Sequence, residues 1–346
     1  MRGARTVHLD IVDYPGEWSL DLPLLDLSYE GWSKQALALA KKRTAESNAF
    51  FELLDNVDPS KKLDELPAQW LAKSFTEYLG ASREAGFSAC APGRFLMPGD
   101  LEGSPVLTFC PLPEAAAKRG TLYREFKRRY EAYKAKVVKP FFKDHFSRID
   151  RQIVLIDALV AVHHGPQAVG DLRGALVDVL KAFRPGRQSW LSSILGRRRV
   201  EKILFAATKA DHLHHNQHPQ LTALMQALVR DAKDCAEFSG AQTSSIAMAS
   251  LRTTVEEAYD HNGVALDCVR GALLETGKQV AMFAGHLPDD PADILNIVQS
   301  DASEWLDDDY AVMNFAPAKI SLKQGYGPPH IRLDKAAEFL LGDKLS

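Results

Sequence analysis

Short apolar runs that stop abruptly at polar residues constrain the fold of this chain more than any other feature. Three such runs, residues 9–12, 153–156 and 200–207, end at Asp13, Asp157 and Thr208. Each has the length of a buried strand, and stretches with helical spacing of apolar residues lie between them. Strands that alternate with helices predict an α/β fold with a mostly parallel sheet. Ligands bind such sheets at the C-terminal ends of the strands, so these polar residues are candidate site residues.

The first run leads into Asp13-Tyr14-Pro15-Gly16. We expect a buried strand that delivers Asp13 to its C-terminal end, followed by a tight turn at Pro15-Gly16. A carboxylate there can hold Mg²⁺ through water, and Gly16 lets a backbone N–H approach a phosphate without a Cβ in the way. An ordinary strand that ends in an Asp turn is the alternative interpretation, because this short pattern is common.

The run at residues 200–207 ends in Thr208-Lys209-Ala210-Asp211. GTP-binding proteins carry [Asn/Thr]-Lys-x-Asp after a strand, where the carboxylate accepts two N–H bonds from guanine and the lysine stem lies over the base. A site of this kind can reject the wrong base by roughly 10⁴-fold, because its buried acceptors would be left unpaired. A third strand-like run, residues 244–250, follows a helical stretch and would place Ala249 and Ser250 near the base. Together these features predict nucleotide binding.

The phosphate-binding P-loop is missing from these residues. No Gly-x-x-x-x-Gly-Lys-[Ser/Thr] occurs in the 346 residues, although P-loop proteins hold the phosphates with that backbone and its lysine. The Asp-x-Pro-Gly element normally follows a P-loop by some tens of residues, yet here it begins at Asp13. We therefore expect a truncated chain that lacks the N-terminal P-loop strand of a P-loop NTPase-type sheet and has negligible turnover alone.

Several of these stretches resemble the YcjX family of stress-associated, P-loop GTPase-like bacterial proteins. The matching segments span essentially the whole chain and are residues 13–18, 21–25, 151–157, 165–167, 204–212, 330–334 and 340–345. The resemblance implies a cytoplasmic protein that binds guanine nucleotide, GTP or GDP, with Mg²⁺. It further implies that Asp13 contributes to Mg²⁺ binding and that the Gly16 N–H senses the γ-phosphate. In this family, Thr208, Lys209 and Asp211 would read the base.

Glu17 is the candidate catalytic residue. It occupies the place where many small GTPases use a Gln to position the attacking water. A glutamate there departs from that pattern, so its role is a hypothesis. Because Thr-Lys-x-Asp is looser than Asn-Lys-x-Asp, an ATPase is an alternative function.

The chain is long enough for more than one core, and its charge is near neutral. We predict a GTPase-like α/β core at residues 1–18 and 151–260, a helical insertion at residues 19–150, and a C-terminal extension at residues 261–346 that packs on the core. The net charge of −3 argues against nucleic-acid binding. The four cysteines lack metal or redox spacing, which is typical of reduced thiols in a cytosolic protein.

The segment Lys118–Lys143 is basic and carries interleaved aromatic residues. It could dock on an acidic membrane surface or a protein partner, which would make the protein a non-enzymatic GTPase-like scaffold that is peripheral to the inner membrane. The favoured interpretation is a packed helix whose basic face is solvated.

Two further clusters invite weaker hypotheses. The arginines of Arg184–Arg199 lie in an expected surface loop that could bind phosphate groups. Four histidines follow the Thr-Lys-Ala-Asp sequence, namely His212, His214, His215 and His218. We expect exposed histidines at a helix start rather than a metal site, because no cysteine and no second carboxylate cluster within the segment completes a tetrahedral ligand set.

Overall fold

A computed structural model describes residues 7–145, 148–181, 200–300, 305, 313–317 and 327–345. The chain divides into two compact units. The sheet unit consists of residues 1–10, 150–177 and 199–346, and the helical unit of residues 11–149 and 178–198. The arginine-rich loop Arg184–Arg199 lies outside the described residues.

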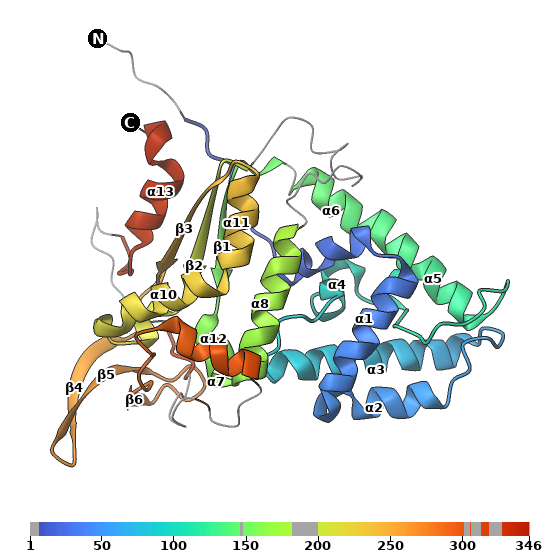
Figure 1. The fold of residues 1–346 in the computed structure, drawn as a ribbon, viewed down its shortest axis with the longest axis horizontal. Helices are drawn as coiled ribbons and strands as arrows, with labels where there is room; N and C mark the ends of the chain where they lie inside the picture. Colours follow the sequence, from blue (N-terminus) through green and yellow to red (C-terminus); the bar gives the residue numbers. More distant parts are fainter. Residues whose placement is uncertain are drawn as a thin grey trace, which may run out of the picture. The chain divides into compact units, whose positions relative to one another are not determined.

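A three-stranded parallel sheet forms the centre of the sheet unit (Figure 1). Its strands are β1 (Arg151–Ile156), β2 (Lys202–Ala207) and β3 (Gln242–Ala247), in the order β1-β2-β3. Helices α7 (Ala158–His163) and α8 (Pro166–Lys181) follow β1, and α10 (His218–Leu228) and α11 (Arg230–Phe238) connect β2 to β3. The middle strand β2 is apolar and buried on both faces, as expected for a parallel strand covered by helices. The α/β prediction is confirmed at this level.

Residues 7–13 correct one expectation. They form no strand, and Leu9 and Ile11 are 56% and 81% exposed. A strand needs a neighbouring strand for its backbone hydrogen bonds, and among the described residues β1 pairs with β2 and β2 with β3, with no pairing to residues 7–13. β1 is an edge of the described sheet, with Leu155 exposed; the predicted additional P-loop strand stays a prediction.

A second, antiparallel sheet belongs to the same unit. It contains β4 (Val255–His261), β5 (Val264–Ala272) and β6 (Gln279–Met282). Asn262 and Gly263 both have positive φ, which is the two-residue turn that matches the twist of a hairpin. Sequence analysis had not recognised the β4–β5 hairpin. Most of its residues are exposed, so the two strands carry polar residues and lack a continuous apolar run.

Helices α12 (Pro291–Ser300) and α13 (Leu333–Leu345) complete the sheet unit. Helix α13 packs Ala336 and Phe339 against Leu204 and Ala206 of β2. Its Asp343 bridges Arg151 of β1 and Lys202 of β2: the Asp343 oxygens lie 2.5 and 2.7 Å from the Arg151 guanidinium, and Lys202 Nζ is 2.8 Å away. The ion pairs therefore fix the helix to the edge where both strands begin.

The helical unit is built around an aromatic core. Its elements are η1 (Gly16–Asp26), α1 (Tyr29–Lys42), α2 (Thr44–Asp55), α3 (Glu65–Glu84), α4 (Gly93–Leu96), η2 (Gly99–Leu101), η3 (Pro105–Leu107), α5 (Leu122–Tyr133), the π-helical turn η4 (Lys134–Val138) and α6 (Lys139–Asp144). Trp32 and Tyr130 stack with ring centroids 5.0 Å apart, and Phe109 meets Tyr130 edge to face. Ser28 and Thr121 accept backbone N–H bonds at the starts of α1 and α5, which satisfies groups that a helix leaves free.

A buried carboxyl joins three segments of this unit. Asp21 of η1 accepts hydrogen bonds from the backbone N–H groups of Gly93 and Arg94 and from the Tyr133 hydroxyl. Burial raises the pKa of Asp21 to about 7, although these hydrogen bonds oppose the shift. Gly93 has no room for a side chain, since a Cβ there would lie 1.8 Å from the Glu17 carbonyl oxygen.

No helix of the described residues is long and apolar enough to cross a membrane.

Candidate functional site

The loop after β2 is held by backbone contacts from both neighbouring strands. Thr208 N–H donates to the Ile156 carbonyl at the end of β1, and Ala210 N–H donates to the Met248 carbonyl after β3. Lys209 takes the left-handed conformation with φ 57°, which turns the chain sharply into the short helix η6 (Ala210–His212). The loop is therefore placed at the C-terminal edge of the parallel sheet, where ligands bind in folds of this kind.

Asp211 is the most tightly positioned of the candidate residues. Its Oδ2 accepts hydrogen bonds from the Thr253 N–H and the Thr253 hydroxyl, both at 2.7 Å, and the Thr254 hydroxyl donates to the Asp211 carbonyl. The residue is 4% exposed. A carboxylate has about four acceptor positions, so two remain on Oδ1, which has no hydrogen-bond partner among the described residues.

Lys209 has a partner that sequence analysis missed. Its Nζ lies 2.8 Å from Asp157 Oδ2, and the other Asp157 oxygen accepts the Val160 N–H at the start of α7. Asp157 was visible as the polar end of the run at residues 153–156, but its pairing with Lys209 depends on β1 lying beside β2. The pair ties the Lys209 side chain to the residue that follows β1.

Ala249 and Ser250, the residues expected near the base, follow β3 and lie beside Ile331. Ala249 N–H donates to the Ile331 carbonyl at 3.1 Å and Ile331 N–H donates back at 2.8 Å, so the Ala249 amide is already used. Ser250 is exposed. Arg332 reinforces this joint, since its guanidinium donates to the Ala247 carbonyl.

The helical unit begins at Ile11, so it contains Asp13, Gly16 and Glu17, whereas residues 1–10 belong to the sheet unit. Asp13 and Gly16 are exposed, and no atom lies within 4 Å of the position that a Gly16 Cβ would take. Glu17 is engaged instead, because its carboxylate forms an ion pair with Arg83 of α3. The Trp18 indole N–H next to it donates to the Met97 carbonyl, which anchors the start of η1.

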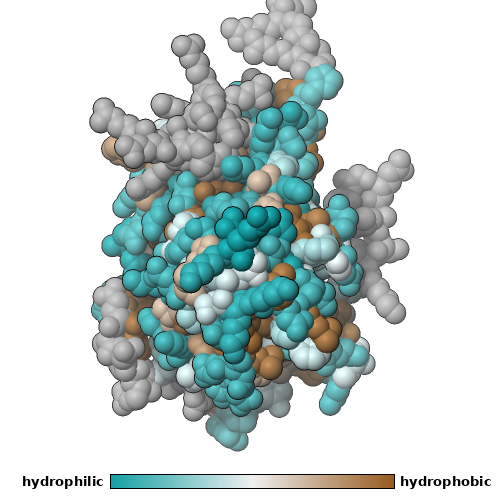
Figure 2. Space-filling view, turned by 90° about the vertical axis from the view of Figure 1, so that its right-hand side faces the viewer, coloured by the Kyte–Doolittle hydropathy of each residue, from teal (hydrophilic) through white to brown (hydrophobic). Residues whose placement is uncertain are grey.

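The segment Lys118–Lys143 packs its aromatic face inward, with Tyr123, Phe126, Tyr130 and Tyr133 all buried. Much of its basic charge is paired within the helical unit, as in the contacts Lys127–Glu30, Arg128–Glu125, Arg129–Glu65 and Lys134–Glu131. Figure 2 shows the side of the molecule at the right of Figure 1, where hydrophilic residues predominate and hydrophobic ones are scattered among them.

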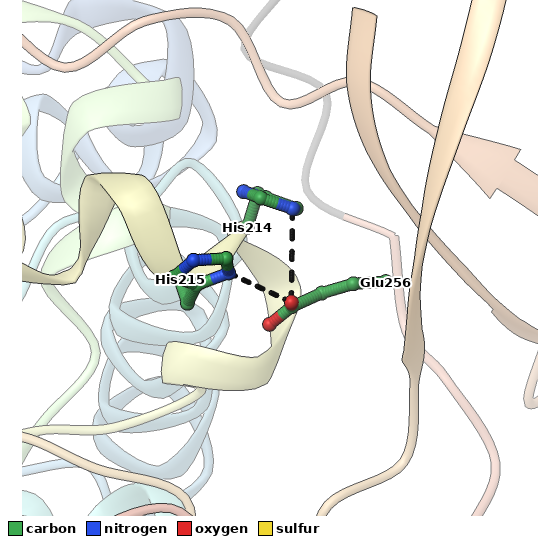
Figure 3. Close-up of side chains that lie close together, drawn as sticks. All are labelled: His214, His215 and Glu256. Carbon is green, nitrogen blue, oxygen red and sulfur yellow. Dashed lines mark hydrogen bonds and ion pairs between the residues drawn. The ribbon is translucent and has the colours of Figure 1, made fainter.

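The histidines near Asp211 are not a uniform exposed group: only His215 is exposed and His214 is half-buried, so that expectation is wrong for three of the four. His212 and His218 are buried. His218 Nε2 lies 2.8 Å from the Ala210 carbonyl, which it helps to hold, and burial lowers the pKa of both rings. His214 and His215 instead face Glu256 of β4 (Figure 3).

A parallel sheet whose middle strand is followed by Thr-Lys-Ala-Asp, with the aspartate held by Thr253, is an α/β arrangement compatible with the P-loop-like class. The chain belongs to the YcjX-like family: the model of that family, DUF463, matches residues 1–345. The predicted family is confirmed.

Two curated relatives carry the description Ras-like GTPase YcjX. The protein of Escherichia coli K12 is 36% identical over 350 residues, which cover 98% of this chain and 73% of the relative. The protein of Shewanella oneidensis MR-1 is 31% identical over 359 residues, which cover 99% of this chain and 71% of the relative.

Proposed function

We propose that this chain recognises guanine nucleotides through the loop after β2, as part of a GTP-binding and GTP-hydrolysing protein. The observation that carries the proposal is the Asp211 carboxylate, which Thr253 holds by one oxygen and whose other oxygen has no partner among the described residues. The description of two relatives as Ras-like GTPases supports it.

The base would be read by charge and hydrogen-bond geometry. Guanine offers two N–H groups on one edge, which matches the two acceptor positions left on Asp211, whereas adenine presents an acceptor there. The Lys209 stem, kept in place by Asp157, covers the base, and Thr208 supports the loop through the Ile156 carbonyl. Since the Ala249 amide is used by Ile331, the backbone contact from this side falls to Ser250.

The phosphate end is less complete in these residues. Asp13 and Gly16 are exposed in the helical unit. On the family resemblance, Asp13 would contribute to a water-coordinated Mg²⁺, which would neutralise phosphate charge when bound, and the Gly16 N–H would contact the γ-phosphate. The ion pair with Arg83 must open before Glu17 can orient a water molecule. The 346 residues contain no P-loop motif, so we expect weak phosphate binding and negligible turnover from this chain alone. Loss of turnover in Glu17→Ala, measured in a version that does hydrolyse GTP, would support a role for Glu17, and unchanged turnover would dismiss it.

The experiment is a base-specificity switch. In Asp211→Asn the two Thr253 donors select the amide oxygen, which leaves the amide NH₂ where Oδ1 was. That group rejects guanine N–H and donates to the C2 carbonyl of xanthine. We expect guanosine nucleotide binding to fall about 100-fold and xanthosine nucleotide binding to appear. Asp234→Asn, an exposed aspartate on α11, is the matched control.

Binding can be followed by saturation-transfer NMR at high nucleotide concentration, which detects weak complexes, with GDP, ADP and XDP in parallel. Equal binding of GDP and ADP by the unmodified chain would refute guanine recognition and favour the ATPase alternative. Binding of none of the three would favour a non-enzymatic scaffold.

A further inference from the structure

Two imidazole rings and a carboxylate from distant parts of the chain converge in the sheet unit (Figure 3). His215 Nδ1 lies 2.8 Å from Glu256 Oε2, and His214 Nε2 lies 3.6 Å from the same oxygen. The three atoms all lie within 4.8 Å of one another. They are the ligand types that borderline divalent cations such as Zn²⁺ prefer.

The local structure explains why these rings point the same way. His214 is extended, with φ −64° and ψ 148°, and His215 begins the short helix η7 (His215–Gln217), directly before α10. The two ring centroids are only 4.4 Å apart. Glu256 comes from β4, some forty residues later, which is why no carboxylate was evident within the histidine segment.

A second carboxylate lies near the other ring nitrogen of His214. Asp267 of β5 lies opposite Ala258 of β4, so it shares a face of the hairpin with Glu256. Its Oδ2 is 3.8 Å from His214 Nδ1, a buried atom without a hydrogen-bond partner, and it accepts a 3.0 Å bond from the Asn216 amide. Metal-binding imidazoles commonly carry such a carboxylate on the other ring nitrogen, where it fixes the tautomer and the ring orientation.

The charges also suit a cation. Arg252 donates to Glu256 Oε1 at 3.1 Å, which leaves Oε2 directed at the histidines. The two carboxylates exceed this single guanidinium by one negative charge. In a tetrahedral site with metal–ligand distances of about 2.0–2.1 Å, ligand atoms lie roughly 3.3 Å apart. The 3.6 Å separation is close to that value, and the 2.8 Å contact would widen as a metal replaces the hydrogen bond.

We propose that His214 Nε2, His215 Nδ1 and Glu256 Oε2 bind a Zn²⁺-like divalent cation, with the fourth position open to water and Asp267 orienting His214. The site joins the loop before α10 to β4. Thr253, which holds Asp211, lies three residues before Glu256. The cation would therefore brace the segment that positions Asp211, although the proposal does not depend on nucleotide binding.

The test uses the full chain without an affinity tag, dialysed against a chelator and then titrated with Zn²⁺ in competition with a chromophoric chelator. We expect one equivalent to bind, and at least tenfold weaker binding by His215→Ala and Glu256→Gln. Asp267→Asn should weaken binding by about 10–100-fold, as outer-sphere partners of metal ligands do. The matched controls are Glu257→Gln, the next residue on the opposite face of β4, and His261→Ala at the hairpin end.

Two further measurements distinguish specific metal binding at these three residues from misfolding of a variant and from non-specific metal binding. Co²⁺ should give the visible absorption of a four-coordinate complex in the unmodified chain and in both controls. Zn²⁺ should raise the midpoint of thermal unfolding of the same three proteins but not of Glu256→Gln, which keeps the size of the side chain. Absence of Zn²⁺ binding in the unmodified chain would overturn the proposal, as would equal affinity in a folded Glu256→Gln variant.

Discussion

The buried Asp21 carboxyl should make the helical unit less stable as the pH rises from 4 to 7. Its pKa is about 7 in the folded chain against 3.8 for an ordinary aspartate, because burial removes water from the charged form. Between these values the folded chain holds a proton that the unfolded chain has released. Stability is therefore fully present below pH 3.8 and is lost as the pH approaches 7.

The magnitude follows from the shift of about three pKa units. At 1.36 kcal/mol per unit, the loss in the free energy of unfolding is on the order of 4 kcal/mol between pH 4 and pH 7. Asp21→Asn cannot ionise, and its amide oxygen can still accept the Gly93 N–H. We therefore expect this variant to lack that component of the pH dependence, while Asp26→Asn, at the exposed end of η1, keeps it.

The assay is urea unfolding followed by tryptophan fluorescence at a series of pH values, since Trp18, Trp32 and Trp70 all lie in the helical unit. Other carboxyl groups titrate over the same range, so the informative quantity is the difference between the unmodified chain and Asp21→Asn. If the two curves run parallel from pH 4 to pH 7, the buried carboxyl is not the cause and the reasoning is refuted.

Two structural predictions concern the other close contacts. Gly93→Ala should lower the free energy of unfolding by about 3 kcal/mol or more in urea titrations, because the new Cβ would overlap the Glu17 carbonyl; Gly174→Ala in α8, where nothing lies within 4 Å, serves as the control and should not destabilise. Asp343→Asn should speed amide hydrogen exchange throughout α13, because it removes the ion pairs with Arg151 and Lys202. Hydrogen bonds from Arg151 and then Lys202 hold the pKa of Asp343 well below its usual range, so the ionised form is the one that holds the helix. The same helix should lose protection in the unmodified chain as the pH falls below the usual aspartate range, and Asp334→Asn should change neither result.

Local patterns were sufficient for much of the fold and for part of the candidate site. The apolar runs at residues 153–156 and 200–207 became β1 and β2. The reason is clearest for β2, which is buried on both faces and therefore needs apolar side chains on both. The family assignment was confirmed by the family model, which matches residues 1–345. The run at residues 9–12 is also mainly apolar but formed no strand, because backbone pairing requires a neighbouring strand, which the residues of the run do not specify.

The sequence by itself determined the α/β class, the family and the identity of the Thr-Lys-Ala-Asp loop, since these depend on residue type and on spacing along the chain. Only the tertiary structure decided that Thr253 holds Asp211, that Asp157 pairs with Lys209, and that Glu256 meets His214 and His215. Each of these contacts joins residues tens of positions apart through strand pairing or a turn. Hydrogen bonds and ion pairs act over a few ångströms, so the chain must fold before distant residues come within that reach.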